Sequence, residues 1–219
     1  MAKTIAFLNP KGGTGKTTLC TNVARGLQLR GANVIIIDTD GQTSACNWRE
    51  EAGENSSYPE VCSLESTDFI KKISEIESER DYILIDGVAQ DMLKTAAAIY
   101  AADLVLTVLS PSKYDVWGAG SMMDMIEQRQ LITDGVPMNR VLINKAIAGT
   151  KQLRRLEEAI SEQNVKTLKS KIISRQVYPS TADGTSVFEE HNKEAVDEIK
   201  SLIDEILMLL EAVELESPK

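Results

Sequence analysis

The chain has 219 residues, of which 42% are apolar and 26% are charged, and its formal net charge is −9. This length suits one domain with a full hydrophobic core, and this composition excludes an intrinsically disordered chain. The negative total argues against a general binder of polyanions.

No targeting or membrane segment is visible at the start of the sequence. The first three residues lead directly into an apolar run, and no apolar run approaches the ~20 residues that span a bilayer. The three cysteines, Cys20, Cys46 and Cys62, form no C-x-x-C pair. We therefore expect reduced thiols in a cytoplasmic protein.

A glycine-rich segment, N-P-K-G-G-T-G-K-T-T over residues 9–18, lies between a predicted strand at 4–8 and a helix pattern that ends at residue 30. Backbone N–H groups of such a turn converge on an anion, and the helix dipole adds favourable potential. Lys16 would neutralise nucleotide phosphates, and the Thr17 hydroxyl would bind Mg²⁺. The alternative, a chance glycine-rich turn, is disfavoured by the flanking strand and helix. We expect nucleotide contacts from Lys11, Gly12, Gly13, Thr14, Gly15, Lys16, Thr17 and Thr18.

Two carboxylates follow the second predicted strand, residues 33–38. Asp38 and Asp40 lie where the strand ends, at the sheet edge where α/β proteins place ligands. Opposite a phosphate-binding loop, they could hold the waters of Mg²⁺ or orient an attacking water. The alternative is an aspartate that caps the next helix.

The middle of the chain continues the alternation of strand and helix. We predict a short helix at 44–51, a short strand at 58–63, a helix at 67–78 and a strand at 81–86. Asp86 ends that strand, which resembles a Walker B strand. The resemblance implies that this aspartate supports Mg²⁺ and that the backbone of Gly87 approaches a γ-phosphate. An ordinary Asp-Gly turn is the alternative.

Further elements are predicted as helices at 91–102 and 117–131 and as strands at 103–109 and 141–145. Continuous apolar strands that alternate with helices indicate a three-layer, doubly wound, mostly parallel α/β sheet with helices on both faces. The methionines of residues 117–131 favour core packing or a dimer contact over a ligand site.

The last third of the chain is predicted as a helix at 151–163, a strand at 166–174 and a closing helix at 192–212 with an acidic polar side. Residues 145–175 hold eight cations against three glutamates, a net charge of +5, which leaves −14 for the rest. This segment could be a basic face or a solvated surface. His191, the sole histidine, would cap or flank the closing helix and has no metal set to join.

Four strings together resemble the family of deviant Walker A ATPases that contains the ParA and MinD proteins, and are most similar to short ParA proteins of the ParF type. They are K-G-G-T-G-K-T-T after Pro10, D-T-D-G-Q at 38–42, A-D-L-V-L with a following P-S at 102–112, and I-S-R-Q-V-Y with D-G-T-S-V-F at 173–188. Gly41 replaces the family's usual proline. The resemblance covers most of the chain and implies one P-loop ATPase domain over residues 1–219, without an N-terminal helix-turn-helix domain.

The resemblance also implies roles for individual residues. Lys11 corresponds to the signature lysine that reaches the partner's nucleotide in an ATP-dependent homodimer. Lys16 and Asp40 would act with it in Mg²⁺-dependent hydrolysis of ATP to ADP and phosphate, with a metal site of Thr17, Asp38, Asp40 and Asp86. Asn144 would contact the adenine ring, since an amide offers a donor and an acceptor; a turn asparagine at a strand end is the alternative.

The function implied is DNA segregation of a plasmid or chromosome. In this family the ATP-bound dimer binds DNA without sequence preference, and a small centromere-binding partner of the ParB or ParG kind stimulates hydrolysis. The protein would then be cytoplasmic, and nucleoid-associated when ATP is bound. Cations of the basic segment are the candidates for phosphate contacts that weaken with salt: Lys151, Arg154, Lys166, Lys169, Lys171 and Arg175.

The same scaffold serves three other functions. A membrane-cycling positioning ATPase like MinD would end in a basic amphipathic helix, whereas this tail is acidic. An electron-transfer ATPase like the nitrogenase iron protein needs cysteines that bridge a cluster, and these three are not so placed. A metabolic ATP-dependent ligase stays open, because the sequence reveals no substrate pocket.

Overall fold

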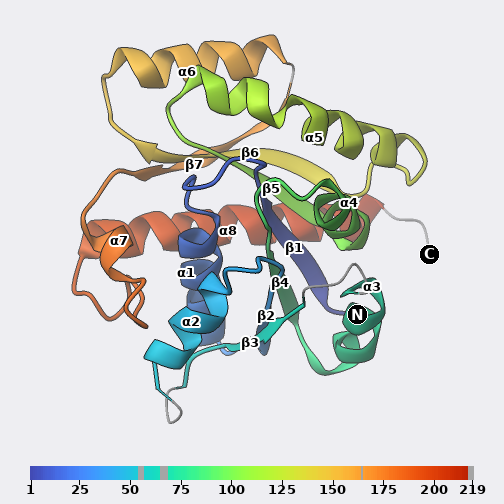
Figure 1. Ribbon diagram of the computed structural model, residues 1–219, viewed down its shortest axis with the longest axis vertical. Coiled ribbons are helices and arrows are strands. Elements are labelled where there is room, and N and C mark those ends of the chain that lie inside the picture. Colours follow the sequence, from blue (N-terminus) through green and yellow to red (C-terminus); the bar gives the residue numbers. More distant parts are fainter. Residues whose placement is uncertain (54–56, 65–68, 164, 217–219) are drawn as a thin grey trace.

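The computed structural model describes residues 1–53, 57–64, 69–163 and 165–216. Seven strands form one sheet in the order β3-β2-β4-β1-β5-β6-β7, and every strand pair in it is parallel (Figure 1). The strands are β1 (Lys3–Leu8), β2 (Val34–Asp38), β3 (Glu60–Ser63), β4 (Tyr82–Asp86), β5 (Leu104–Leu109), β6 (Met138–Ala146) and β7 (Thr167–Ile173).

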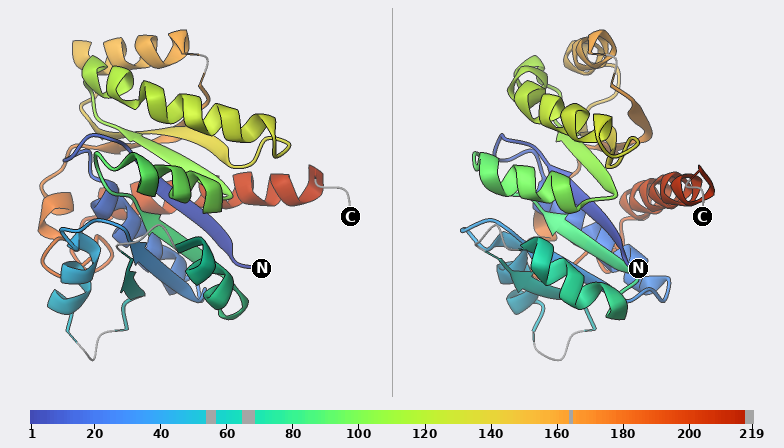
Figure 2. Two further views of the ribbon diagram at one scale, coloured as in Figure 1. Left: turned by 45° about the vertical axis from the view of Figure 1, so that its right-hand side comes forward. Right: turned by 90° about the vertical axis from the view of Figure 1, so that its right-hand side faces the viewer.

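Helices cover both faces of the sheet, as the edge-on view in Figure 2 shows. One apolar core joins α1, α2 and α8 to the sheet, and a second core on the opposite face joins α3, α4, α5 and α6 to it. The predicted three-layer α/β fold is confirmed. The helices are α1 (Lys16–Leu29), α2 (Ser44–Glu51), α3 (Phe69–Ile76), α4 (Met92–Ala101), α5 (Lys113–Leu131), α6 (Lys151–Glu162), α7 (Val177–Ser180) and α8 (Lys193–Glu216), with a short 3₁₀ turn, η1 (Glu77–Glu79), after α3.

The apolar sequence of the strands explains why they lie inside. Ile5, Ile36 and Leu84 face the α1 side. Ala6, Ile37 and Ile85 face the other side. None of these six side chains is exposed to solvent. Since both faces are buried, the strands need apolar residues at every position rather than at alternate ones. The methionines of α5 lie in the core that joins α3, α4, α5 and α6 to the sheet. Met122 is buried, and Met123 and Met125 are partly buried.

The strand order reverses at β1, which has β4 on one side and β5 on the other. Because all the strands are parallel, the segments that follow β1, β2, β4, β5 and β6 leave the sheet at one edge. Those segments carry the phosphate-binding loop and the predicted carboxylates, so the topology gathers the candidate site at the point where open α/β sheets bind ligands.

Several element boundaries differ from the sequence prediction. α5 begins at Lys113 rather than at residue 117. Its first turn carries Asp115, which suits a helix start, and the buried Val116, which begins the apolar series of this helix. α7 was not predicted. Asn192 rather than His191 caps α8, with its Oδ1 accepting the Ala195 N–H at 3.0 Å. The predicted helix start at residues 67–68 and the chain end at 217–219 lie outside the described residues.

The β7 edge of the sheet is covered by carboxylates of α8. Glu205 accepts the backbone N–H groups of Lys169 and Ser170 at 2.7 and 2.9 Å, and Glu198 accepts that of Ile173 at 3.1 Å. Unpaired edge groups would otherwise invite pairing with another chain. Among the described residues, no helix is both long enough and apolar enough to cross a bilayer.

Candidate active site

The segment between β1 and α1 forms an open loop that is anchored from both sides. Asn9, which is buried, donates from Nδ2 to the Val108 carbonyl on β5 at 2.6 Å, and its Oδ1 accepts the Lys11 N–H at 2.7 Å. Gly13 and Gly15 have φ values of 74° and 93°, which side chains disfavour. Among the described residues, the backbone N–H groups of 12–15 have no hydrogen-bond acceptor. The loop therefore offers free donors at a helix N-terminus, as an anion site requires.

Lys16 lies inside this loop with only 8% of its surface exposed. Its Nζ donates to the Lys11 carbonyl at 3.2 Å. Burial lowers the pKa of Lys16, and the nearby carboxylates of Asp86 and Asp40 oppose that shift. A buried ammonium with one carbonyl partner retains donors for a phosphate.

Thr17 and Asp86 form a pair directly below the loop. The Thr17 hydroxyl donates to Asp86 Oδ2 at 2.7 Å, while Oδ1 of the same carboxylate is buried and accepts no hydrogen bond from the described residues. Burial raises the pKa of Asp86 to about 7, against the lowering effect of the Thr17 hydrogen bond. An orphaned carboxylate oxygen beside a hydroxyl is a donor set that suits Mg²⁺, so these residues fit the metal that the sequence implies.

Asp38 and Asp40 have different surroundings in the structure. Asp38 is buried and accepts three backbone N–H groups, from Asp40 at 3.0 Å, Ala45 at 2.9 Å and Cys46 at 3.1 Å. Both of its oxygens are therefore committed to the turn and to the start of α2, as the capping alternative predicted. Asp40 uses one oxygen for the Gln42 N–H at 3.0 Å, and its other oxygen accepts no hydrogen bond from the described chain.

Thr39 ties the ends of β2 and β4 together. Its N–H and its hydroxyl both donate to the Asp86 carbonyl, at 3.1 and 2.8 Å, and the hydroxyl accepts the Val88 N–H at 3.1 Å. Lys94 on α4 adds a bond from Nζ to the Thr39 carbonyl at 3.0 Å. The two segments that would flank a γ-phosphate are thus coupled. Sequence reasoning missed Lys94, whose position within a helix gave no signal.

Gly41 and Gly87, which follow the ends of β2 and β4, differ in the space available for a side chain. A Cβ at Gly87 would lie 2.7 Å from the Phe7 carbonyl oxygen, so that position packs too closely on β1 for any side chain. A Cβ at Gly41 would meet nothing within 4 Å. The structure therefore gives no steric reason for glycine at residue 41.

The Lys11 side chain contacts α5 of its own chain. Its side chain is 52% exposed, and Nζ lies 2.5 Å from Asp115 Oδ1. Asp115 is fully buried, and its other oxygen accepts the backbone N–H of Ser110 at 3.2 Å and the Ser110 hydroxyl. The sequence analysis did not select Asp115; its position just after a strand at the ligand edge was the available signal.

Asn144 and Lys145, at the end of β6, both contact the phosphate-binding loop. Asn144 donates from Nδ2 to the Thr14 carbonyl at 2.7 Å, and Lys145 donates from Nζ to the Gly13 carbonyl at 2.8 Å. The structure thus places Asn144 beside the phosphate-binding loop, while its contact with adenine stays a prediction. It also adds Lys145, which the sequence analysis includes only in the basic segment.

The six candidate DNA-contacting cations lie on α6, on β7 and beside them, but in two environments. Lys171 pairs with Glu157, and Arg175 makes two bonds to Glu198 at 2.8 and 2.9 Å. The other four are exposed and make no ion pair within the described residues: Lys151, Arg154, Lys166 and Lys169.

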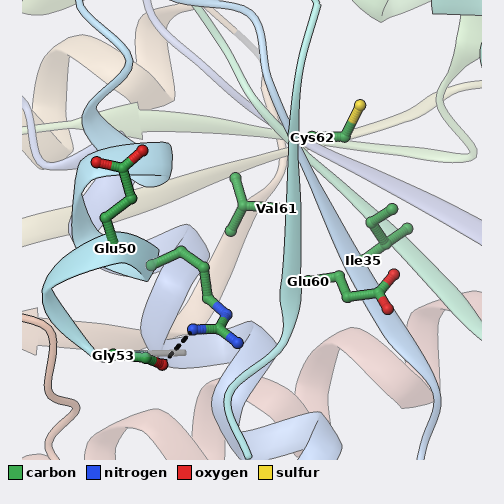
Figure 3. A pocket seen from close by; sticks show the side chains of 7 residues that line it. Ile35, Glu50, Gly53, Glu60, Val61 and Cys62 are labelled. Atoms are coloured by element: carbon green, nitrogen blue, oxygen red, sulfur yellow. Dashed lines mark hydrogen bonds between the residues drawn. The ribbon is translucent and has the colours of Figure 1, made fainter. Parts of the chain in front are cut away.

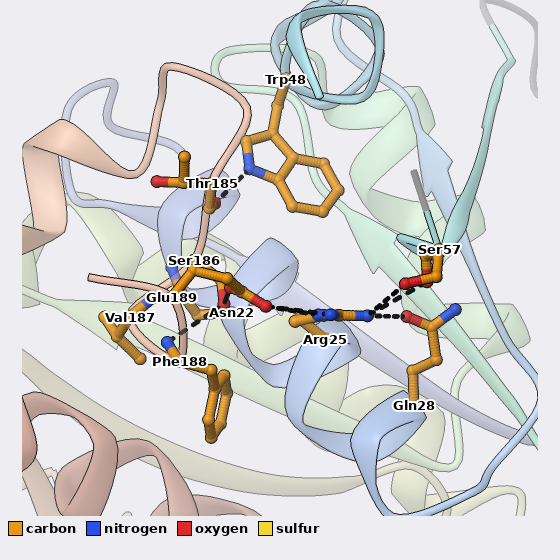
Figure 4. A network of polar contacts seen from close by, with 10 residues as sticks. All are labelled: Asn22, Arg25, Gln28, Trp48, Ser57, Thr185, Ser186, Val187, Phe188 and Glu189. Carbon is orange, nitrogen blue, oxygen red and sulfur yellow. Dashed lines mark hydrogen bonds and ion pairs between the residues drawn. The ribbon is translucent and has the colours of Figure 1, made fainter. Parts of the chain in front are cut away.

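The C-terminal strings of the resemblance have structural roles. Tyr178 donates its hydroxyl to Glu198 at 2.8 Å, so the arginine and tyrosine of I-S-R-Q-V-Y meet one carboxylate. The D-G-T-S-V-F segment packs on α1 and α2 (Figure 4). There the Trp48 indole donates to the Thr185 carbonyl at 2.8 Å, and Asn22 Oδ1 accepts the Val187 N–H at 2.8 Å.

Arg25 extends this network toward β3. It pairs with Glu189 at 2.9 Å, donates to the Ser57 carbonyl at 3.1 Å, and lies 4.5 Å from the Tyr58 ring centroid. These contacts hold the C-terminal loop against α1, and they place no group at the phosphate-binding loop.

A separate cleft of about 600 Å³ lies between the end of α2 and the edge strand β3 (Figure 3). In the picture the Val61 side chain lies on the side of β3 that faces Glu50, and the Cys62 side chain lies on the opposite side of β3. None of the predicted site residues lines this cleft, so it does not extend the candidate active site. Its lining residues are Ile35, Arg49, Glu50, Gly53, Glu60, Val61 and Cys62.

Comparison with known proteins places this geometry in a family. Residues 5–187 match the model of the CobQ/CobB/MinD/ParA nucleotide binding domain. The chain is 28% identical to maintenance of carboxysome distribution protein A of Halothiobacillus neapolitanus over 211 residues, which cover 94% of this chain and 97% of that protein.

Two solved structures illustrate the likeness of fold. The ATP complex of McdA from Cyanothece matches with a TM-score of 0.74 at 15% identity, over 94% of this chain and 96% of that one. MinD of Pyrococcus horikoshii, complexed with Mg-ADP, matches with a TM-score of 0.69 at 18% identity, over 94% and 96%. At these identities the likeness establishes the P-loop α/β fold.

Proposed function

The chain belongs to the CobQ/CobB/MinD/ParA nucleotide-binding domain family, and from this premise we propose that it is a Mg²⁺-dependent ParA-type ATPase that positions a cellular cargo. The observation that carries the proposal is the orphaned oxygen of Asp86 beside Thr17, below a loop of free N–H donors. A buried carboxylate oxygen without a hydrogen-bond partner is costly unless a cation completes it.

The loop residues from Lys11 to Thr18 bind the polyphosphate in this proposal. Backbone N–H groups of 12–15 contact phosphate oxygens, and Lys16 neutralises their charge at short range. Thr17 and Asp86 hold Mg²⁺, which when bound offsets charge on the β- and γ-phosphates. Solved structures of McdA with ATP and of MinD with Mg-ADP, which share this fold, support the choice of ligand.

Hydrolysis is assigned to Asp40 rather than to Asp38. One carboxylate oxygen of Asp40 accepts no hydrogen bond from the described residues, and the charge of Asp40 opposes the lowering of the Lys16 pKa by burial. Asp40 would orient the attacking water and accept its proton. Asp38, whose oxygens hold the backbone at Asp40, Ala45 and Cys46, positions this segment.

Dimerisation would use Lys11, as the family resemblance implies. In the single chain Lys11 is paired with Asp115, so reaching a partner's nucleotide requires that this ion pair open. Lys11 is half-exposed and lies in a loop, so its side chain has room to turn outward.

The cargo is proposed from the relatives. The curated relative that matches nearly end to end is named for carboxysome distribution, whereas the ParA resemblance favours plasmid or chromosomal DNA. Both cargoes fit a cytoplasmic ATPase that binds nonspecific DNA of the nucleoid through the exposed cations of the basic segment and is released when a partner protein stimulates hydrolysis. One domain over residues 1–219 suffices for this cycle.

One experiment tests the proposal. ATP hydrolysis is measured with and without nonspecific double-stranded DNA, and the oligomeric state is measured by light scattering with ATP, with ADP and without nucleotide. We expect Mg²⁺-dependent turnover and a dimer with ATP only. A chain that binds no ATP, or that stays monomeric with it, would refute the proposal.

A further inference from the structure

The two edges of the sheet differ in how they are covered. At the β7 edge, carboxylates of α8 accept the backbone N–H groups of Lys169, Ser170 and Ile173. At the opposite edge, β3 pairs with β2 on one side, and no second strand among the described residues pairs with its other side. An open strand edge presents N–H and C=O groups with which an extended segment of another chain can pair.

The cleft of about 600 Å³ beside β3 follows this open edge. It is lined from both faces of the strand, by Val61 on the side of α2 and by Glu60 and Cys62 on the opposite side (Figure 3). Because successive side chains alternate between the faces, a hollow that touches consecutive residues of an edge strand passes along its outer edge. The four residues of β3 span about 13 Å at ~3.3 Å per residue, which sets the length of a segment that can pair there.

Both walls of the cleft are held by the body of the protein. The end of α2 packs on the C-terminal loop, where a Cβ at Gly184 would lie 2.3 Å from the backbone nitrogen of Ala52. The segment that leads into β3 packs through Tyr58, whose ring centroid lies 5.2 Å from that of Trp48 on α2. A ligand would therefore meet a preformed surface, which lowers the entropic cost of binding.

The charge of the cleft favours one kind of occupant. Glu50 and Glu60 line it; Glu60 pairs with Arg80, whereas Glu50 is exposed and makes no ion pair within the part of the chain that the structure describes. Arg49, the cation of the lining, donates to the Gly53 carbonyl at 2.9 Å. Pairing of two copies of this chain along β3 would bring these carboxylates together, which disfavours a second copy as the occupant. A cationic segment of a different protein would be attracted instead.

The two walls of the cleft meet at Asp38. Its carboxylate accepts the N–H groups of Ala45 and Cys46 at the start of α2, at 2.9 and 3.1 Å, and its carbonyl accepts the N–H of Leu64 after β3 at 2.8 Å. Asp38 Oδ1 also accepts the Asp40 N–H at 3.0 Å. A segment that fixes β3 relative to α2 therefore acts on the backbone of Asp40, the residue to which hydrolysis is assigned.

We propose that the open edge of β3 is a docking site for an extended, cationic segment of a partner protein, which pairs with residues 60–63 as an additional strand. Its backbone forms hydrogen bonds with the strand edge, an apolar side chain packs on Val61, and a lysine or arginine meets Glu50. Docking does not depend on the proposed function, whereas its effect on turnover through Asp38 rests on it.

Synthetic peptides test the docking. Three octapeptides are titrated by fluorescence anisotropy into the full chain without nucleotide: one that alternates valine and lysine, one with glutamate in place of lysine, and the lysine peptide N-methylated at four consecutive central residues. We expect the lysine peptide to bind at least about tenfold tighter than the other two, because it alone has both the charge and the backbone donors. It should also slow hydrogen exchange at residues 60–63. No binding of the lysine peptide, equal affinities of the three, or binding without protection at residues 60–63 would overturn the proposal.

Charge reversal separates the cleft from the general surface. Glu50→Lys should weaken the lysine peptide by about tenfold and strengthen the glutamate peptide. Glu158→Lys is the matched control, because Glu158 is an exposed carboxylate on α6, which covers the part of the sheet far from β3 (Figure 1). The control should change neither affinity. Equal weakening by the two variants would reduce the binding to net charge and overturn the proposal.

The effect on turnover is measured separately. A saturating concentration of the lysine peptide should change kcat for ATP hydrolysis by about fivefold or more in the unmodified chain, and should have little effect on Glu50→Lys at the same concentration. Docking with an unchanged kcat would overturn the coupling through Asp38. A chain that binds the peptide but hydrolyses no ATP would overturn the proposed function and leave the docking site in place.

Discussion

The carboxyl edge of the sheet and the basic segment at residues 145–175 both carry the charges on which function depends, but they hold them differently. At the sheet edge, Lys16, Asp38 and Asp86 are buried, and each is placed by backbone or side-chain bonds. In the basic segment, Lys166 and Lys169 are exposed and form no ion pair within the described residues.

This difference indicates where a single residue decides function. A buried charge interacts through a medium of low polarity and cannot be replaced by water, so one substitution has a large effect. An exposed charge is screened by solvent and salt, and its neighbours can substitute for it. Substitutions at the sheet edge should therefore have larger effects than substitutions in the basic segment.

Lys16→Ala should cause the largest loss. We expect Mg-ATP affinity to fall by about 1,000-fold, because a buried ammonium facing phosphate has no solvent substitute. Calorimetric titration measures the change. Lys193→Ala, an exposed lysine at the start of α8, is the control and should bind normally. ATP binding within tenfold of the unmodified chain would place Lys16 outside the phosphate site.

Asp40→Ala should separate binding from turnover. We expect kcat to fall by about 100-fold while the Kd for Mg-ATP stays within about twofold, because a positioned general base acts mainly on the chemical step. ATP-dependent dimerisation should persist. Asp124→Ala removes an exposed carboxylate on α5 and should leave kcat unchanged. Normal turnover in Asp40→Ala would refute its assignment.

Asp86 should make the stability of the metal-free protein depend on pH. Its pKa is raised by burial to about 7 from an ordinary 3.8, so between about pH 4 and pH 7 the folded state retains a proton that the unfolded state has released. The free energy of unfolding should therefore fall as pH rises through this window, by up to about 1.4 kcal/mol per pH unit.

Chemical denaturation in chelator from pH 5 to pH 7 measures that slope. Asp86→Asn should remove the fall that belongs to this carboxyl group, while Asp124→Asn should retain it. Identical slopes for the unmodified chain and Asp86→Asn would show that burial does not perturb this group.

The basic segment should show the smallest effects per residue. Lys166→Ala and Lys169→Ala should each weaken nonspecific DNA binding by about two- to fourfold and reduce the log–log salt slope by about one. Lys171→Ala and Arg175→Ala should change the slope less, because Glu157 and Glu198 already pair with these cations. Fluorescence anisotropy at several salt concentrations measures both quantities. Equal changes in slope at the paired and exposed cations would contradict the predicted difference between them.

Much of the fold could be predicted because its signals are local. Helix α2 was predicted with its observed bounds, and β1, β2, β4 and β5 within one residue, since continuous apolar runs bounded by glycine or aspartate define buried parallel strands. The start of α5 was placed late although the buried Val116 begins its apolar repeat, and α7 was not predicted because its four residues are too few to show one. The sheet proved to be all-parallel rather than mostly parallel.

The candidate site was predicted by residue type but not by partner. Lys16, Thr17 and Asp86 lie together as expected. The oxygens of Asp38, however, accept three backbone N–H groups, and the amide nitrogen of Asn144 donates to the loop. Asp115 and Lys145 were not selected, because each contacts the phosphate-binding loop across more than 100 positions of the sequence.

Short-range pattern and backbone geometry specify three features: the phosphate-binding loop, the alternation of strands and helices, and the carboxylates that end the strands. Which of these charged groups are free depends on the tertiary structure. A carboxylate or amide can serve a ligand or the backbone, and the choice depends on which distant groups the sheet brings within 3 Å of it. Hydrogen-bond partners at that range are set by topology, which no local pattern records.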